Sequence, residues 1–136
     1  MQTTLLAAIA VLALLGAAPS PAPTDQRVFE LRTYHTPPGK LDALNARFRD
    51  HSITLLERHG MKVVGFWVPT EANQGSADTL VYILAHKNRA AADASWAAFR
   101  ADPEWVRVKA ESEKDGSLTT KVESVFMSPT DYSPMK

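Results

Sequence analysis

Residues 28–34 alternate between two kinds of side chain, and this alternation predicts a β-strand. One face of the predicted strand is apolar, because Phe29 and Leu31 point to the same side. The other face is mixed, and it projects Glu30, Arg32 and Tyr34 together. The segment therefore predicts a first strand whose polar side chains share whatever surroundings that face meets.

A helical period follows a break that contains two prolines and a glycine. Over residues 41–59 the apolar positions recur at about 100° per residue and form one stripe. The stripe consists of Leu41, Leu44, Phe48, Ser52, Leu55, Leu56 and His59. This pattern predicts a long helix that lies on a sheet, and Gly60 predicts its end.

Two further segments, 62–68 and 79–85, are apolar on both faces, and each predicts a strand. Strands of this kind need cover on both sides. A chain of 136 residues has few elements that could supply two covers. The pattern therefore predicts that the chain's own helices close one face of the sheet and that a second copy closes the other. The polar loop 69–78 is long for a hairpin, and its purpose stays open.

The second half of the chain predicts another helical region and a last strand. Asn88 is a suitable cap for a helix over residues 89–101, and Asp102 before Pro103 predicts a break and a second helical piece. Residues 121–127 predict the fourth strand. The order βαββαβ predicts an α+β fold, a ferredoxin-like antiparallel sheet with two helical segments on one face.

The opposite face of this sheet would be apolar. Left uncovered, it would expose more apolar surface than a soluble monomer usually tolerates. We therefore expect a symmetric homodimer in which two sheets pack back to back.

Residues 5–18 form an uninterrupted apolar run that differs sharply from the rest of the chain. The run is shorter than the roughly 20 residues that span a bilayer, and small residues and prolines follow it. The sequence predicts a signal peptide with its cleavage region over 1–24, one domain over 25–128 and a C-terminal arm over 129–136. We expect a periplasmic or secreted protein with no stable membrane span after cleavage.

Charge and cysteine content exclude several classes of function. Lys plus Arg and Asp plus Glu number 15 each, so no basic field exists to hold nucleic acid. Cysteine is absent, which excludes disulfides, thiolate zinc sites and a thiol nucleophile. A metal site would need His, Asp and Glu alone, and we predict neither a metal site nor a cofactor.

Several blocks of the chain, in the same order, resemble the NIPSNAP domain family. These blocks are VFELRTY at 28–34, PGKL at 38–41, HGMKVVGFW at 59–67, WAAFRADPEW at 96–105 and PTDYSP at 129–134. The resemblance implies the dimeric α+β barrel fold, which antibiotic-biosynthesis and haem-degrading monooxygenases share. For function it implies little. Family members in animals are associated with mitochondria and with interaction and trafficking roles, and bacterial members mostly lack an assigned activity.

The three polar residues of the first strand support two interpretations. In the first, they line a ligand pocket in which Arg32 holds a carboxylate or another anion, Glu30 orients it and Tyr34 donates or accepts a proton. In the second, they form a buried polar network that fixes the register of the dimer. Arg32 would then pair with Glu30 or with Glu123 on a neighbouring strand.

Histidines are candidates for acid–base chemistry. His59 lies centrally on the helical stripe, although a single histidine on an apolar face is more often a core or helix-end residue. His51 and His59 are too far apart along the helix to share a metal. His35 and His86 fall at the ends of predicted elements, where we expect them to face solvent.

Three tryptophans, Trp67, Trp96 and Trp105, either line a cavity for a flat ligand or pack in the core. The candidate pocket comprises Glu30, Arg32, Tyr34, His59, Trp67 and Glu123.

Three functions remain open. The first is an exported, homodimeric domain that binds a small hydrophobic or anionic molecule, or another protein, without catalysis. The second is a cofactor-independent, monooxygenase-like enzyme that uses Arg32, Tyr34 and His59 in the barrel pocket. The third is a haem-binding protein, which requires a histidine directed into that pocket.

Overall fold

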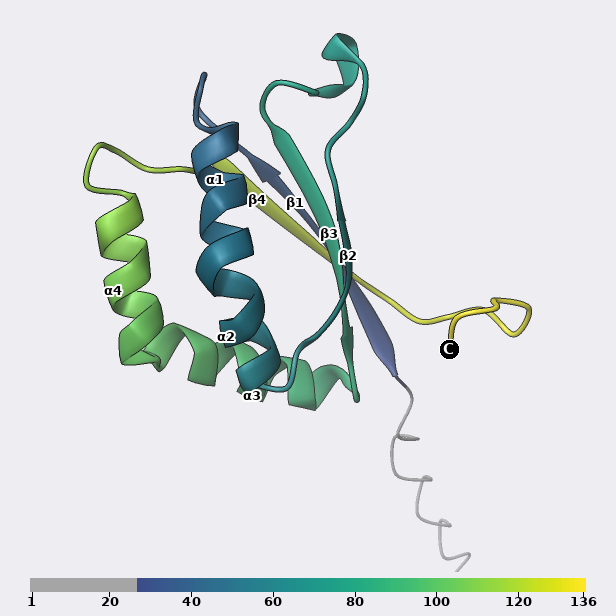
Figure 1. Ribbon diagram of the computed structural model, residues 1–136. Helices are drawn as coiled ribbons and strands as arrows, with labels where there is room; N and C mark the ends of the chain where they lie inside the picture. Colours follow the sequence, from purple (N-terminus) through teal and green to yellow (C-terminus); the bar gives the residue numbers. More distant parts are fainter. Residues whose placement is uncertain (1–26) are drawn as a thin grey trace, which may run out of the picture.

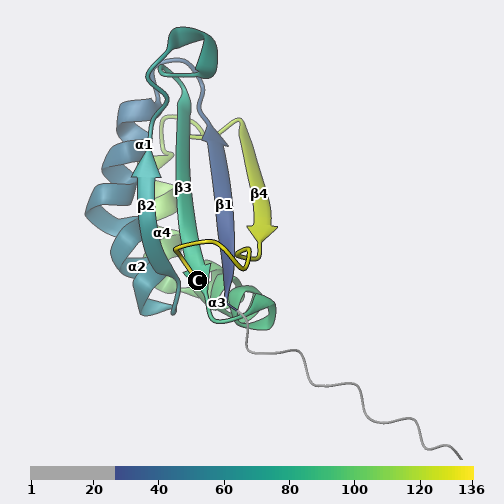
Figure 2. The same ribbon diagram turned by 90° about the vertical axis from the view of Figure 1, so that its right-hand side faces the viewer.

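The computed structural model describes residues 27–136, so the predicted signal segment lies outside the described residues. Four strands form one antiparallel sheet in the order β2-β3-β1-β4, seen face-on in Figure 2. The strands are β1 (Val28–His35), β2 (Lys62–Trp67), β3 (Thr79–His86) and β4 (Lys121–Met127). Because β1 lies between β3 and β4 and pairs antiparallel with both, the predicted ferredoxin-like topology is confirmed.

The α-helices of residues 27–136 cover the same face of the sheet (Figures 1 and 2). They are α1 (Leu41–Arg47), α2 (Ile53–Arg58), α3 (Arg89–Ala101) and α4 (Pro103–Ser112). α1 and α2 form one column on this side of the sheet, and α4 stands beside them, farther from the strands (Figure 1). The predicted cap of α3 is present, since Asn88 Oδ1 accepts a hydrogen bond from the Ala91 N–H at 2.8 Å.

The first helical column is not a uniform α-helix. Between α1 and α2 lies a π-helical turn, η1 (Phe48–Ser52), in which the Ile53 N–H donates to the carbonyl of Phe48, five residues earlier. Phe48 and Ser52 are both buried against the rest of the protein. The stripe read from the sequence is therefore the buried face, while the change of helix type within it was not predicted.

The core lies between the sheet and the helices. On β3 the core-facing residues are Leu80, Tyr82 and Leu84, and all three are almost fully buried. In the sheet register they stand opposite Tyr34, Arg32 and Glu30 of β1, respectively. The polar residues of β1 therefore lie on the helix-covered face, in the interior of a single protomer.

The other face of the sheet, which we call the outer face, carries apolar residues that the helices do not cover. Trp67 is 51% exposed and Val125 is 54% exposed. Residues 128–136 cross the lower part of this face (Figure 2), where Pro129 and Met135 lie near Phe29. The chain thus covers part of its outer face itself and leaves the rest open.

The loop 69–78 contains one short 3-10 turn, η2 (Ala72–Gln74). Among residues 27–136, no helix has the length and apolar character needed to cross a membrane.

Candidate functional site

Glu30 is the centre of a buried hydrogen-bond network on β1. Its side chain is 1% exposed. Its Oε1 accepts from Arg32 Nη1 at 2.6 Å and from Ser124 Oγ at 2.7 Å. Its Oε2 accepts from Trp96 Nε1 at 2.7 Å and lies 2.8 Å from His86 Nε2. Both oxygens are therefore saturated by groups from three strands and a helix.

These contacts keep Glu30 ionised despite its burial. Burial alone would raise the pKa of a carboxyl group. Here the hydrogen bonds from His86, Trp96, Ser124 and Arg32 outweigh burial and lower the pKa of Glu30 from 4.5 to about 2. The interior therefore holds a fixed negative charge in direct contact with Arg32.

Arg32 connects this network to a cavity. Its Nη2 donates to Tyr34 Oη at 3.3 Å, and its guanidinium carbon lies 4.3 Å from the ring centroid of Trp96. Burial would lower the pKa of Arg32, but its interactions with Tyr82, Tyr34 and Glu30 raise that pKa above the usual value. Arg32 is thus a permanent cation whose buried Nε–H has no acceptor among the described residues.

Two tyrosine hydroxyls meet beside Arg32. Tyr82 Oη donates to Tyr34 Oη at 3.0 Å. Burial raises the pKa of Tyr82 well above its usual value, and the neighbouring Tyr34 adds to that rise. Because the Tyr34 oxygen already accepts from Arg32 and from Tyr82, its own proton remains available for a ligand.

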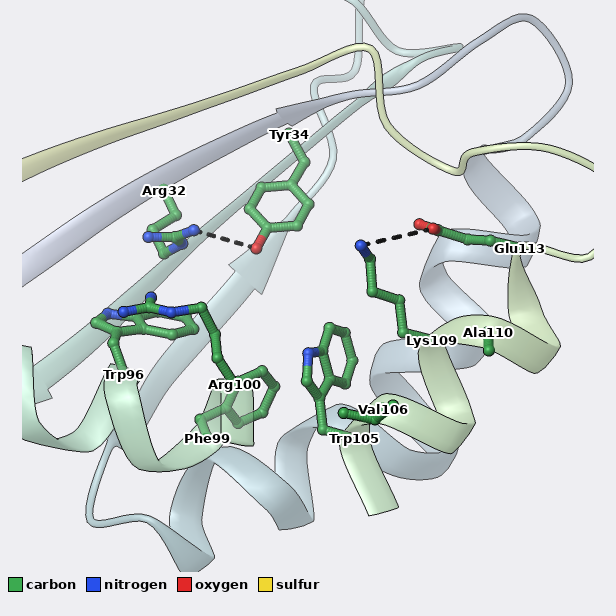
Figure 3. A pocket seen from close by; sticks show the side chains of 10 residues that line it. All are labelled: Arg32, Tyr34, Trp96, Phe99, Arg100, Trp105, Val106, Lys109, Ala110 and Glu113. Atoms are coloured by element: carbon green, nitrogen blue, oxygen red, sulfur yellow. Dashed lines mark hydrogen bonds and ion pairs between the residues drawn. The ribbon is translucent and has the colours of Figure 1, made fainter. Parts of the chain in front are cut away.

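A cavity of about 600 Å³ opens beside these groups, on the helix-covered side of the sheet and so opposite the outer face. We call it the outer cavity. β1 contributes Arg32 and Tyr34, α3 contributes Trp96 and Phe99, and α4 contributes Trp105 and Lys109 (Figure 3). The cavity thus combines aromatic rings with charged side chains, and both the strand and the helices contribute to each kind. This composition suits a flat organic molecule with a negative group.

A second cavity of about 220 Å³, the inner cavity, adjoins the outer one. The residues that line both are Tyr34, Trp96, Phe99, Trp105, Lys109 and Glu113. The walls of the inner cavity alone include Phe48 from η1 and Tyr82 from β3.

Half of the candidate pocket residues lie elsewhere. Of the predicted set, the structure brings Glu30, Arg32 and Tyr34 together. His59 lies at the end of α2, with its Nε2 2.7 Å from Asp102 Oδ2. Trp67 lies on the outer face.

Glu123 also lies on the outer face, where its Oε2 is 3.0 Å from His35 Nε2 and its Oε1 is 2.7 Å from Lys121 Nζ. Hydrogen bonds from Lys121 and His35 lower the pKa of Glu123. Arg32 therefore pairs with Glu30 and not with Glu123, and its network faces the helices, where it cannot contact a second copy packed on the outer face.

Sequence reasoning missed several residues of the site. The expectation that His86 faces solvent was wrong, because it is 2% exposed and contacts Glu30. Trp96 was considered as a cavity wall, but its hydrogen bond to Glu30 was not predicted. Tyr82 carried no signal beyond its place in an apolar strand, since its partner Tyr34 is 48 residues away.

The histidines do not fit the haem alternative at this site. All four lie within residues 27–136, and none of them lines the outer or the inner cavity. Over the same described part of the chain, no group of three His, Asp or Glu side chains is arranged to hold a metal ion.

Similarity to known proteins agrees with this architecture. Residues 29–134 match the family model of NIPSNAP. A NIPSNAP family protein of unknown function from Agrobacterium tumefaciens is 24% identical, with 83% of this chain and 96% of that chain covered and a TM-score of 0.70. An uncharacterised NIPSNAP domain protein from Burkholderia xenovorans is 21% identical, with 79% and 98% covered and a TM-score of 0.66. No curated protein matches the chain.

A more distant structural relative is an enzyme. It is a monooxygenase of Streptomyces coelicolor, solved in complex with the ligand nanaomycin D. It is 13% identical, with 80% of this chain and 92% of that chain covered and a TM-score of 0.53. At this identity the likeness concerns the fold alone.

Proposed function

The chain belongs to the NIPSNAP family, and from that premise we propose that it is a binding domain for a small, flat organic anion held in the outer cavity. The proposal rests on one observation, the surroundings of the Arg32 side chain. This residue is a cation fixed by Glu30, flanked by Trp96, and left with an N–H that no described residue accepts. Such an arrangement matches a carboxylate on an aromatic ring.

The balance of charge around the cavity supports an anionic ligand. Arg32, Arg100 and Lys109 line it, and Glu113 is its one lining carboxylate. Glu113 is itself paired with Arg47 at 3.1 Å and lies 3.9 Å from Lys109. With the paired residues included, four cations (Arg32, Arg47, Arg100 and Lys109) stand against two carboxylates (Glu30 and Glu113), so the net charge around the cavity is positive.

Calorimetric titration with 2-naphthoate tests the proposal. Arg32→Gln should weaken binding roughly 10- to 150-fold, because a hydrogen bond to a charged group contributes about 1.5–3 kcal/mol. Arg107→Gln is the matched control, since Arg107 pairs with Glu111 and does not line the cavity. Circular dichroism and thermal unfolding establish that both variants fold. Absence of binding to wild type by 2-naphthoate, salicylate and indole-3-acetate would rule the proposal out.

We further propose that the domain is an exported homodimer. The exposed Trp67 and Val125 support association through the outer face. The apolar run at 5–18 supports export. Cell fractionation with mass spectrometry tests export and cleavage. Recovery of the protein from the cytoplasmic fraction alone would contradict export, and an exported chain that retains residues 1–18 would contradict cleavage.

A catalytic use of the same cavity is the second candidate, and the available proton of Tyr34 beside Arg32 favours it. A monooxygenase-like enzyme would consume oxygen in the presence of an oxidisable aromatic probe such as 1-naphthol. Tyr34→Phe should then slow oxygen uptake by about 100-fold, the lower range for loss of a general acid or base. Oxygen uptake equal to that of a protein-free control would exclude this candidate for the probe and leave the binding proposal standing.

A further inference from the structure

Two residues that line the inner cavity each have a buried polar atom with no hydrogen-bond partner within residues 27–136. Ser52 is 1% exposed, and its Oγ has no hydrogen-bond partner among the described residues. The Nε of Arg47 likewise has none, while Arg47 Nη1 donates to Ser112 and to Glu113. Ser52 and Arg47 both line the inner cavity. Because buried polar groups are almost always hydrogen-bonded, we expect their partner to be a molecule bound in the cavity.

Ser52 ends the π-helical turn, in which the Ile53 N–H donates to the carbonyl of Phe48. In a helix, a serine hydroxyl can bond back to the carbonyl four residues earlier, but Ser52 Oγ has no such partner among the described residues. The Ser52 hydroxyl is thus free to bind a ligand, and π-helical turns are frequent at functional sites.

Tyr34 adds a third donor at the junction of the two cavities. Its oxygen accepts from Arg32 and Tyr82, so its hydroxyl proton has no acceptor in the network. Donors from Ser52, Arg47 and Tyr34 therefore line a small space whose walls include the ring of Phe48. Such a space complements an aromatic ring that carries an acceptor oxygen.

We propose that the inner cavity binds the oxygen-bearing end of a fused-ring ligand whose anionic end faces the basic residues of the outer cavity. The inference rests on the proposed function, because it assigns the second end of the same ligand. The ligand class is then an aromatic molecule with a negative group at one end and a hydroxyl or carbonyl oxygen at the other.

Two naphthoates that differ by one hydroxyl test this inference. The dissociation constants of 2-naphthoate and 6-hydroxy-2-naphthoate are measured by calorimetry for wild type, Ser52→Ala and Ser95→Ala. Ser95 is the matched control, since it is partly buried on α3 and lines neither cavity. Wild type should bind the hydroxylated compound about tenfold more tightly, as expected for one satisfied hydrogen bond.

In Ser52→Ala the preference for the hydroxylated compound over 2-naphthoate should fall to twofold or less. Ser95→Ala should keep the tenfold preference. 3-Hydroxy-2-naphthoate places its hydroxyl beside the carboxylate, so its affinity should not depend on Ser52. Thermal unfolding establishes that both variants fold.

Equal affinities of the two naphthoates for wild type, or a preference that survives Ser52→Ala, would overturn the inference. If 2-naphthoate binds in an Arg32-dependent manner and the hydroxyl adds nothing, only the inner-cavity inference fails. If neither naphthoate binds wild type, both the inference and the proposed function fail.

Discussion

At the scale of single residues, Glu30 decides the electrostatics of the site. Its buried carboxylate accepts hydrogen bonds from Arg32, Ser124 and Trp96 and contacts His86. These groups come from β1, β4, α3 and β3, so one side chain joins three strands to a helix. The charge of Glu30 therefore holds Arg32 in position and stabilises the fold at the same time.

The pH dependence of stability should report this charge. The pKa of Glu30 is lowered from 4.5 to about 2 in the folded protein. Its ionised form therefore stabilises the fold fully above pH 4.5, and this contribution is lost as the pH falls from 4.5 towards 2. The contribution is about 3 kcal/mol. Glu30→Gln should lower the free energy of unfolding by that amount at pH 7.

Denaturant unfolding at pH 7, 5, 3 and 2 measures the effect. The difference between wild type and Glu30→Gln should shrink below pH 4.5, because wild type loses its charge there while the variant has none to lose. The charged or titratable groups that face Glu30 are Arg32 and His86, and both are retained in the variant. Glu57→Gln, at an exposed position of α2, is the control. A difference that is constant over this range would contradict the assigned role.

At the scale of elements, the junction between α3 and α4 positions one wall of the outer cavity. Asp102 Oδ1 accepts from the Glu104 N–H at 2.8 Å and so caps α4. Its Oδ2 lies 2.7 Å from His59 Nε2 and 3.5 Å from Arg58 Nη1. The hydrogen bond from His59 and that from the Glu104 N–H lower the pKa of Asp102. One aspartate thus starts α4 and ties it to the end of α2.

Asp102→Ala should therefore destabilise the protein and loosen the cavity wall. We expect the melting temperature to fall by roughly 5 °C, the size typical of one lost helix cap in a domain of this length. Asp102→Asn should recover part of that loss, because the Asn side chain can still accept from the Glu104 N–H. Differential scanning calorimetry measures both variants.

The control for this experiment is Asp93→Ala, which removes an exposed carboxylate from α3 that pairs with Arg89 in the next turn back. It should leave the melting temperature nearly unchanged. If Asp102→Asn melts as low as Asp102→Ala, capping is not what Asp102 contributes.

At the scale of the whole molecule, the two faces of the sheet differ in what covers them. The helices bury one face and form the two cavities there. The outer face is only partly covered, by residues 128–136 (Figure 2). The proposed homodimer would cover the rest, so ligand binding and association would use opposite faces of one sheet.

A charge on the outer face should separate the proposed dimer. Trp67 is 51% exposed and Val106, on α4, is 56% exposed, so the two give a matched pair of apolar-to-glutamate changes. Trp67→Glu should shift the sedimentation equilibrium from dimer to monomer, because a buried, unpaired carboxylate at an interface is strongly unfavourable. Val106→Glu should stay dimeric. A wild-type protein that sediments as a monomer at micromolar concentration would contradict the dimer.

The spacing of apolar and polar residues within single segments was enough to predict the helices and strands and the side chains that β1 contributes to the site. The period of two in β1 placed Glu30, Arg32 and Tyr34 on the same side, and the structure keeps them together. The period near 3.6 in the first helical region identified Leu44, Phe48 and the rest of its buried stripe. These features depend on neighbours within about one helical turn or two strand positions, so they can be predicted from the sequence without knowledge of the fold.

The tertiary structure alone decided which residues complete the site. His86 reaches Glu30 from 56 positions away, and Trp96 reaches it from 66. His59 and Trp67 shared the local signals of pocket residues, yet one faces Asp102 and the other the outer face. The register between strands and the side on which helices cross them are set by contacts between distant segments. No periodicity within a single segment encodes such contacts.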